Sequence, residues 1–269
     1  MSKKERIDVR LVQEGYFPSR EQARRHIMAG EVLVDDEVIL KPGEKVRLDQ
    51  TIRIRGQAMR YVSRGGYKLE KAIEEFSLDL KDFVVLDIGS STGGFTDCAL
   101  QNGAKRVYAV DVGYNQLDWR LRSDDRVDVM ERFNFRYATP EDFNDAPDFA
   151  TIDVSFISLR LILPPLYSIL KEKGKVVALI KPQFEAGKER VGKKGIIRDP
   201  KVHEDVLVEI IDFMSKNGYH VNRITFSPIR GSEGNIEFLA YLEKAETMEG
   251  TVSPTIDIKK IVKDAHNLD

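Results

Sequence analysis

The sequence predicts an α/β protein in which a small α+β domain precedes a larger α/β sandwich. Short apolar runs typical of buried strands recur from residue 84 to residue 242, with helical patterns between most of them. Before them, two short helical patterns are followed by strand-like runs and turns. A length of 269 residues fits one large and one small domain. We therefore expect a small domain at residues 1–60, a large domain at residues 61–244, and a tail at residues 245–269 in which the run 256–262 is compatible with a helix.

Composition excludes several classes of protein. With 42% hydrophobic and 32% charged residues, the chain has the make-up of a globular protein. It contains no apolar run near the roughly 18 residues that span a bilayer and no apolar segment at its start, so we expect a cytoplasmic protein that does not bind membranes. A lone Cys98 and four scattered histidines lack metal-ligand spacing, so no metal is expected.

Charge is divided unevenly along the chain. Residues 1–62 carry 13 Lys and Arg against 10 Asp and Glu, whereas the rest carries 29 against 34. Affinity for phosphate depends on the local arrangement of cations, so this modest balance neither supports nor excludes RNA as a partner.

The first domain opens with a predicted helix at residues 4–14. A second helix begins after Ser19, which can cap it, and ends at Gly30. Three arginines lie beside its apolar face: Arg20, Arg24 and Arg25. Strand-like runs follow at residues 32–34, 38–40 and 46–54, with a turn at Asp35–Asp36 between the first two.

This order of residues resembles an RNA-binding module. The run Ser-Arg-Glu-Gln-Ala-Arg-Arg-His-Ile from Ser19, followed by Gly-Glu-Val-Leu-Val from Gly30, is similar to the module of the fourth small-subunit ribosomal protein, over about residues 4–60. The resemblance implies that the arginines contact structured RNA; the alternative is a solvated face on a structural helix. The module usually has Asn-Gly where this chain has Asp35–Asp36, whose charge would repel phosphate.

A Gly-rich turn in the large domain indicates a cofactor site. The buried strand at residues 84–89 runs into this turn, a helix follows, and the glycines permit close approach of a ligand to the backbone. About 20 residues later the next strand ends in Asp111, where a carboxylate accepts hydrogen bonds from ribose hydroxyls in the Rossmann pattern; a strand-end cap is the alternative. Asp87, before the first glycine, favours S-adenosyl-L-methionine over a nicotinamide dinucleotide. The predicted cofactor-binding residues are Asp87, Gly89, Ser90, Ser91, Thr92, Gly93, Gly94, Phe95 and Asp111.

Charged residues lie at the ends of the fourth and fifth predicted strands. The strand at residues 149–153 ends in Asp153, and Lys181 follows the strand at residues 175–180. Ligands of open α/β sheets collect at the carboxyl ends of strands, and a buried charge requires a partner or a function. A structural ion pair is the alternative. With two further candidates, the set is similar to the Lys-Asp-Lys-Glu tetrad of ribose 2′-O-methyltransferases: Lys68, Asp153, Lys181 and Glu237.

Motifs along nearly the whole chain resemble the TlyA, or hemolysin A, family, whose catalytic domain is FtsJ-like. They start at Ser63 (Ser-Arg-Gly-Gly), Asp87 (Asp-Ile-Gly-Ser-Ser-Thr-Gly-Gly-Phe-Thr-Asp), Asp153 (Asp-Val-Ser-Phe-Ile-Ser-Leu) and Lys181 (Lys-Pro-Gln-Phe-Glu). The resemblance implies a Rossmann-like class I methyltransferase domain that methylates the cytidine 2′-hydroxyl in 23S, and in some members also 16S, ribosomal RNA. The partner would be ribosomal RNA or a ribosomal subunit. Family members often carry Arg-x-Trp-Val between the domains, and this chain has Arg60-Tyr61-Val62-Ser63 without the Trp.

Lys181 is the predicted base, since a ribose hydroxyl is a poor nucleophile. Burial and the like charge of Lys68 favour the neutral amine, whereas Asp153 and Glu237 favour ammonium. If the carboxylates prevail, Lys181 instead stabilises the developing alkoxide and Asp153 orients it.

Two further groups of residues are candidates for RNA contacts. Phe156 and Trp119 can stack on bases, with packing in the core as the alternative. A Gly-punctuated loop carries four basic residues that can contact phosphate or form a solvated charge run: Lys188, Arg190, Lys193 and Lys194.

Three rival functions remain for comparison. Methylation of a base amino group is favoured by Asp/Asn-Pro-Pro-aromatic at the end of the fourth strand, but Asp153 begins Asp-Val-Ser-Phe. A ribosome-assembly protein that binds RNA without catalysis is a second class. Membrane lysis is the third, and no pore-forming pattern supports it.

Overall fold

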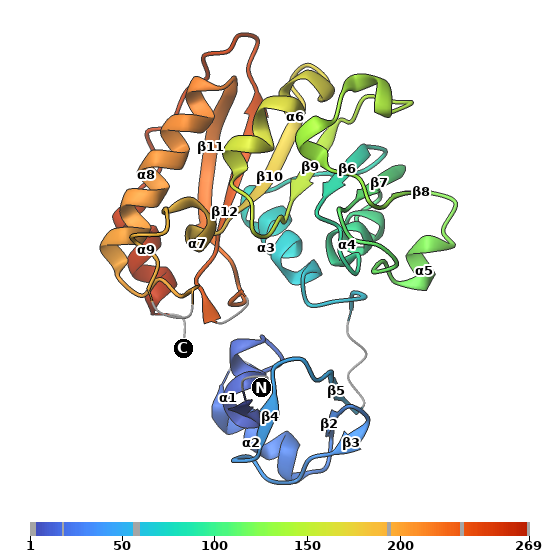
Figure 1. Ribbon diagram of the computed structural model, residues 1–269, viewed down its shortest axis with the longest axis vertical. Helices are drawn as coiled ribbons and strands as arrows, with labels where there is room; N and C mark the ends of the chain where they lie inside the picture. Colours follow the sequence, from blue (N-terminus) through green and yellow to red (C-terminus); the bar gives the residue numbers. More distant parts are fainter. Residues whose placement is uncertain (1–3, 18, 56–59, 193–194, 232–233, 268–269) are drawn as a thin grey trace.

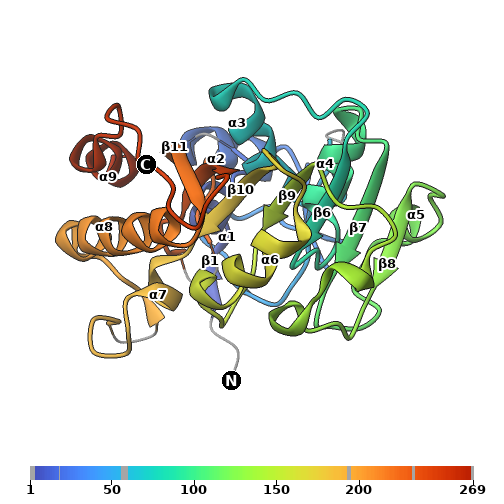
Figure 2. The same ribbon diagram turned by 90° about the horizontal axis from the view of Figure 1, so that it is seen from above.

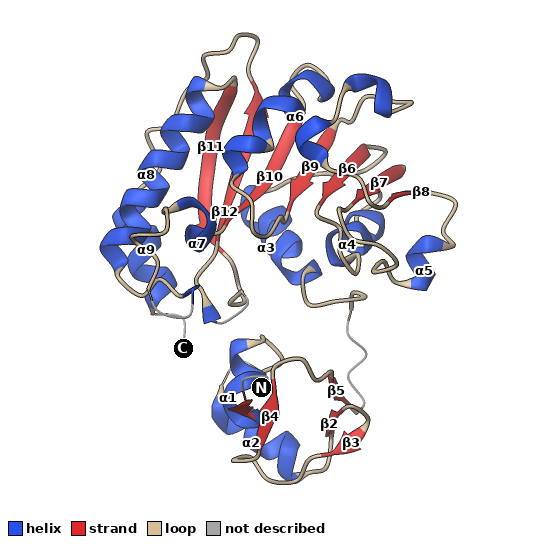
Figure 3. Ribbon diagram, in the orientation of Figure 1, coloured by secondary structure: helices blue, strands red, loops and turns tan. Residues whose placement is uncertain are grey.

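The predicted α/β fold class with a small α+β domain at the N-terminus is confirmed (Figure 1). The computed structural model describes residues 4–17, 19–55, 60–192, 195–231 and 234–267. Figure 3 shows strands gathered into one large sheet with helices around it, and a separate group of short elements at the N-terminal end.

The N-terminal group packs two helices against short strands. Its elements are β1 (Lys4–Arg6), α1 (Ile7–Gln13), α2 (Arg20–Met28), β2 (Val32–Val34), β3 (Glu37–Val38), β4 (Lys45–Arg47) and β5 (Ile52–Ile54). β1 pairs with β4, and β2 lies between β3 and β5. Apolar residues of both helices and of β2, β4 and β5 form one core, which holds the small domain together.

Two expectations for this domain are corrected. The first helix begins at Ile7 rather than at residue 4, because residues 4–6 pair with β4 as a strand. The strand expected at residues 46–54 is divided into β4 and β5 by a turn in which the Gln50 side chain accepts a hydrogen bond from the Arg47 amide (2.8 Å). The predicted cap of the second helix is confirmed, since Ser19 Oγ accepts a hydrogen bond from the Gln22 amide (3.3 Å).

The large sheet has seven strands. In spatial order they are β11 (Tyr219–Phe226), β12 (Phe238–Lys244), β10 (Lys175–Ile180), β9 (Phe149–Ile152), β6 (Val84–Ile88), β7 (Arg106–Val110) and β8 (Val127–Met130). β12 is antiparallel to both neighbours, and the pairs from β10 to β8 are parallel. β12 starts at Phe238, so that Glu237 lies just before it.

Helices cover both faces of this sheet (Figure 2). One face carries α3 (Gly66–Phe76), α4 (Gly94–Gln101) and α5 (Trp119–Arg122). The other carries α6 (Leu163–Ile169), α8 (Pro200–Lys216) and α9 (Ile258–His266), with α7 (Pro182–Glu185) after β10. Short 3₁₀ helices lie at Phe135–Tyr137, Pro140–Asp142 and Leu159–Leu161. Alternation along β6 sends Leu86 into one core and Val85 into the other, which produces three layers.

Within the described ranges, no helix has the length and apolar character needed to cross a membrane.

The hairpin between β2 and β3 turns on two residues with positive φ, Asp35 (48°) and Asp36 (67°). This backbone suits Asn-Gly, and an aspartate there is strained. The Asp35 carboxylate compensates by accepting hydrogen bonds from the Thr51 amide and the Gln50 side chain, both at 2.9 Å. Asp36 makes an exposed ion pair with Arg53, which contributes little.

We predict that Asp36→Gly raises the free energy of local opening of this hairpin by about 0.5–1 kcal/mol, because glycine removes the strain. Hydrogen exchange of the Ile39 amide, which donates to the Val32 carbonyl oxygen across this hairpin (2.9 Å), measures that free energy. Asp35→Gly is the control and gains less, since it also loses the two hydrogen bonds. An equal rise in the free energy of opening in the two variants would show that the hydrogen bonds of Asp35 do not compensate for its strain, which would contradict this account.

Candidate active site

Three strand ends and the first turn of a helix meet at one edge of the sheet. Asp153 follows β9 and Lys181 follows β10, which run parallel as neighbours. β12 runs the opposite way, so its first residues lie at the same edge, and the pairing of Ile180 with Phe238 brings Glu237 beside Lys181. Lys68 reaches this edge from the first turn of α3. The fold therefore collects the four predicted tetrad residues in one place.

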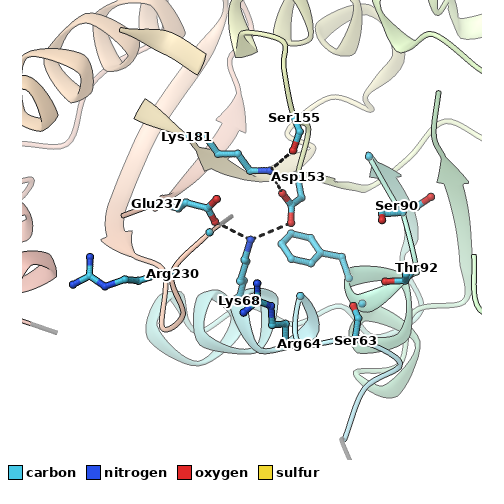
Figure 4. Close-up of a pocket in the computed structure, with 16 residues that line it drawn as sticks. Ser63, Arg64, Lys68, Ser90, Thr92, Asp153, Ser155, Lys181, Arg230 and Glu237 are labelled. Carbon is cyan, nitrogen blue, oxygen red and sulfur yellow. Dashed lines mark hydrogen bonds and ion pairs between the residues drawn. The ribbon is translucent and has the colours of Figure 1, made fainter. Parts of the chain in front are cut away.

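These four side chains form a continuous chain of alternating charges (Figure 4). Lys181 Nζ lies 2.5 Å from Asp153 Oδ1, and Lys68 Nζ lies 3.4 Å from Asp153 Oδ2. Lys68 Nζ also lies 2.8 Å from Glu237 Oε2. Lys181 has a second polar contact, because it donates a hydrogen bond to Ser155 Oγ (3.0 Å). Two cations and two anions thus balance.

These charges must balance because the side chains are largely shielded from water, where an unpaired charge is costly. The side chains of Lys68 and Lys181 are each 9% exposed and that of Glu237 is 2% exposed. Burial alone would lower the pKa of Lys68, but Asp153 and Glu237 outweigh it and raise that pKa. Burial alone would raise the pKa of Asp153, but Lys68 and Lys181 outweigh it and lower that pKa. Lys68 is therefore an ammonium ion and Asp153 a carboxylate.

The charged chain opens onto a cavity of about 310 Å³. Figure 4 shows Ser90 and Thr92 across this space from Lys181 and Glu237. Residues of the Gly-rich loop form one wall: Gly89, Ser90, Ser91, Thr92, Gly94 and Phe95. The rest of the wall includes the tetrad, Ser63, Arg64, Gly65, Ser155, Arg230 and Gly231. One cavity thus joins the predicted cofactor loop to the tetrad.

Two glycines of the loop permit backbone segments to pack closely. Gly89 has φ +85°, and a Cβ there would lie 2.6 Å from the carbonyl oxygen of Asp153. A Cβ on Gly94 would lie 2.4 Å from Ser63 Oγ and 2.7 Å from the Gly66 amide nitrogen. These glycines set the distances from the loop to the end of β9 and to the start of α3, and hence to Asp153 and Lys68.

Three of the predicted cofactor residues do not line the cavity. Asp87 is fully buried, and its carboxylate accepts hydrogen bonds from the hydroxyls of Thr96 (2.6 Å) and Thr151 (2.8 Å). Gly93 lies against Leu117 and Leu121. Asp111 accepts hydrogen bonds from the Ser91 amide (2.8 Å) and the Gly113 amide (2.7 Å). In this structure Asp87 and Asp111 therefore hold the loop in position.

The predicted RNA-contact residues are in several different environments. Arg20 and Arg24 both bond to Asp8, whereas Arg25 pairs with the exposed Glu21. Lys188 is exposed.

Arg190 makes several contacts inside the large domain. Its guanidinium binds Glu209 with two hydrogen bonds (2.7 and 2.9 Å) and donates to the Ala186 carbonyl oxygen, so it is committed to internal contacts. Lys193 and Lys194 lie outside the described residues.

The two aromatic candidates are both exposed. Phe156 is 91% exposed, and its φ of +63° is unusual for a bulky residue. Its loop is fixed, because Glu185 accepts hydrogen bonds from the Ser158 hydroxyl (2.6 Å) and the Leu159 amide (2.8 Å). The ring lies 5.1 Å from that of Phe184 between centroids. Trp119 is also exposed, but it does not line the cavity.

Sequence reasoning missed three residues of this site. Ser155 accepts a hydrogen bond from Lys181 and lies in the motif that begins at Asp153, from which only Asp153 and Phe156 were predicted to have roles. Arg64 lines the cavity and also reaches the first domain, with Nη1 3.9 Å from Glu14 Oε2. Arg230 comes from the segment after β11, and no sequence pattern connects it to the tetrad.

Comparison with known proteins agrees with this geometry. The FtsJ-like methyltransferase family model matches residues 61–244, and the S4 domain model matches residues 5–52. A Mycobacterium tuberculosis protein named 16S/23S rRNA (cytidine-2′-O)-methyltransferase TlyA is 39% identical over 243 residues, which are 90% of this chain and 91% of that protein. The chain belongs to the TlyA family of FtsJ-like methyltransferases.

Two other TlyA-like proteins cover almost the whole chain. The Bacillus subtilis protein YqxC, provisionally named an rRNA methyltransferase, is 59% identical over 98% of this chain and 95% of its own length. A solved structure from Streptococcus thermophilus that carries a hemolysin name shares 53% identity with a TM-score of 0.82, covering 100% of this chain and 98% of that one. The seven-strand order with one antiparallel strand is typical of class I methyltransferases, so the family and fold inferred from the sequence are confirmed.

Asp87 gives this TlyA-family site a measurable pH dependence. Burial outweighs the two threonine hydrogen bonds and raises the pKa of Asp87 from 3.8 to about 6. Between these values the folded chain binds a proton that the unfolded chain releases, so stability falls as the pH rises from about 4 to 6, by roughly 3 kcal/mol.

We predict that Asp87→Asn abolishes this decline, because an amide has the same shape and does not titrate. Urea unfolding of both proteins at several pH values measures the effect. The stability of the wild type relative to the variant should fall between pH 4 and pH 6 and stay level above it. A difference that does not change with pH would contradict the buried, raised carboxyl.

Proposed function

We propose that this chain transfers a methyl group from S-adenosylmethionine to the 2′-hydroxyl of a cytidine in ribosomal RNA. The name of the Mycobacterium tuberculosis relative supports 23S and 16S RNA as substrates. The observation that carries the proposal is the buried Lys-Asp-Lys-Glu chain on the wall of the cavity formed by the Gly-rich loop.

The cavity suits the cofactor in size and chemistry. At about 310 Å³ it lies in the range of small-molecule sites, roughly 300–1,000 Å³. The loop residues that would hold the cofactor are Gly89, Ser90, Ser91, Thr92, Gly94 and Phe95. Asp111 would accept ribose hydroxyls, since a carboxylate has about four acceptor sites and the two backbone amides use two of them. When bound, S-adenosylmethionine supplies an electrophilic methyl group.

Lys181 is the better candidate for the base than Lys68. Lys68 contacts two carboxylates and its pKa is raised, so it stays charged. Lys181 contacts only Asp153, which it shares with Lys68, and its second partner is the neutral hydroxyl of Ser155. We propose that Lys181 first loses its own proton to solvent through the cavity and that its neutral amine then takes the proton of the attacking 2′-hydroxyl, while Asp153 orients the amine and Lys68 stabilises the developing negative charge on the oxygen.

Several exposed groups suit an RNA substrate. Phe156 is exposed on a fixed loop, three residues after Asp153 and one after Ser155, where a nucleobase can stack on its ring. Arg64 and Arg230 line the cavity, and arginine binds phosphate through two parallel hydrogen bonds. Glu14 and Arg64 connect the S4 domain to this wall, so RNA on that domain lies near the cavity.

The rival functions fit the structure less well. Amino methylation has no use for the two buried lysines beside Asp153. A membrane-lytic role finds no spanning helix in the part of the chain that is described. A binder without catalysis would not require a balanced buried tetrad, which costs desolvation to form.

The direct test is to incubate the full chain with labelled S-adenosylmethionine and unmodified 23S or 16S RNA, free or in subunits. A methylated nucleotide mapped by resistance to alkaline cleavage should be a cytidine. Methylation of a base would support the amino-methyltransferase rival, and RNA binding without transfer would support the assembly-factor rival. Either result would overturn the proposal.

We predict that Lys181→Ala lowers kcat by about 10²–10⁴-fold, the typical contribution of a general base, while cofactor affinity measured by calorimetry changes little. Lys181→Arg should be as inactive, because a guanidinium keeps its proton. Substantial activity in Lys181→Arg would show that the residue acts as a fixed charge. The control is Lys175→Ala, at the opposite end of β10. Unchanged transfer in Lys181→Ala would refute the role.

For Phe156→Gly we predict a higher KM for RNA, by about 5–150-fold if stacking contributes roughly 1–3 kcal/mol. Because the ring is exposed and φ is positive, the free energy of unfolding should stay constant or rise. A steady-state titration with RNA and a urea unfolding curve measure the two effects. An unchanged KM, or a large loss of stability, would contradict an exposed stacking residue.

A further inference from the structure

Ser155 holds the amine of Lys181 from a second direction. Its Oγ accepts a hydrogen bond from Lys181 Nζ (3.0 Å), and Asp153 Oδ1 lies 2.5 Å from the same nitrogen. Figure 4 shows both contacts converging on one amine from two residues of the segment that follows β9. All three residues line the cavity. The amine is therefore held at two points on the wall where the methyl acceptor is proposed to bind.

The segment that carries Ser155 is tied to the segment that carries Lys181. Glu185 in α7 accepts hydrogen bonds from the Ser158 hydroxyl (2.6 Å) and the Leu159 amide (2.8 Å). Because α7 directly follows Lys181, these bonds fix the two segments relative to each other. Ser155 itself is exposed, so its position comes from this backbone arrangement and not from close packing around its side chain.

The two buried lysines differ in the charge of their partners. Lys68 lies between two carboxylates, those of Asp153 and Glu237. Lys181 lies between one carboxylate and the neutral hydroxyl of Ser155. A carboxylate keeps a proton on an ammonium ion through its negative charge, whereas a hydroxyl accepts an N–H bond without adding charge. Ser155 thus fixes the direction of the amine and hinders the loss of a proton less than a second carboxylate would.

The N–H bonds of Lys181 decide where its lone pair forms. An ammonium ion has three of them, and among the described residues Asp153 and Ser155 each accept one. The third proton is the one that water in the cavity can remove. Its loss leaves the lone pair at that corner of the nitrogen, while the other two N–H bonds stay with the carboxylate and the hydroxyl. The proton of an attacking 2′-hydroxyl then passes to this lone pair, which restores the ammonium ion.

We propose that Ser155 is a positioning residue for the methyl transfer: by accepting one N–H bond of Lys181, it directs the lone pair of the neutral amine toward the 2′-hydroxyl. The inference rests on the proposed function, because it takes Lys181 as the base. Without the serine hydroxyl, the amine keeps one partner and can rotate about its carbon–nitrogen bond, so that the lone pair faces the acceptor for only part of the time. Loss of the hydroxyl should therefore lower kcat and leave substrate binding unchanged.

The test compares Ser155→Thr with Ser155→Val in methyl transfer to 23S RNA by the full chain. The two introduced side chains have nearly the same shape and differ in the hydroxyl, so a role in packing alone would affect both variants equally. We expect kcat of Ser155→Thr to exceed that of Ser155→Val by about 10–100-fold, the effect of one hydrogen bond to a charged group.

The matched measurements are the KM for RNA, the cofactor affinity by calorimetry and the urea unfolding curve, each of which should be similar in the two variants. Equal kcat values would overturn the proposal. A difference in KM in place of kcat would show that the hydroxyl contacts RNA directly, and that result would overturn it as well.

A double variant shows whether Ser155 acts through Lys181. In a Lys181→Ala background no amine is left to orient, so adding Ser155→Val should change the residual kcat by less than about twofold. A further loss as large as that in the wild-type background would show independent action and overturn the proposal. Absence of methyl transfer by the wild type would instead refute the proposed function.

Discussion

The structure of the site depends on one constraint, the balance of two positive and two negative charges at a largely buried edge of the sheet. Lys181, Asp153, Lys68 and Glu237 come from different elements, and removing any one leaves the set with an unbalanced charge. Two features of the fold meet this constraint: the first turn of α3 lies at this edge, and β12 runs antiparallel to β10, so that it begins at this edge and places Glu237 there. A site assembled in this way holds the lysine amines in place before substrate arrives, so little reorganisation remains for the reaction itself.

The Gly-rich loop follows β6 and forms one wall of the cavity. Gly89 allows the ends of β6 and β9 to meet, and Gly94 allows the segment before α3 to cross the loop. Asp87 does not line the cavity. It stabilises the loop by accepting hydrogen bonds from the hydroxyls of Thr96 and Thr151. The sequence suggested Asp87 as a cofactor contact, and in the structure it instead holds the loop in its conformation. Arg64 and Glu14 extend the same wall toward the S4 domain.

Much of the fold follows from local patterns. The bounds of β10 coincide with the strand expected at residues 175–180, and the adjacency of Asp153 and Lys181 follows from parallel strands. The sequence could not show that Arg190 is committed to Glu209 on a later helix, or that Asp8 is buried under arginines from other segments, because those contacts depend on tertiary packing. An acidic residue in the first turn of an amphipathic helix is usually solvated. Arg230 was missed for the same reason.

The central claim is that the tetrad faces the methyl acceptor. A crystal structure of the full chain with a non-reactive cofactor analogue and an RNA containing the target cytidine tests it most directly. We predict that the ribose 2′-oxygen lies within hydrogen-bonding distance of Lys181 Nζ, about 2.6–3.2 Å, with the cofactor against the Gly-rich loop. A complex in which the cytosine amino group occupies that position, and the ribose points away from Lys181, would contradict the account.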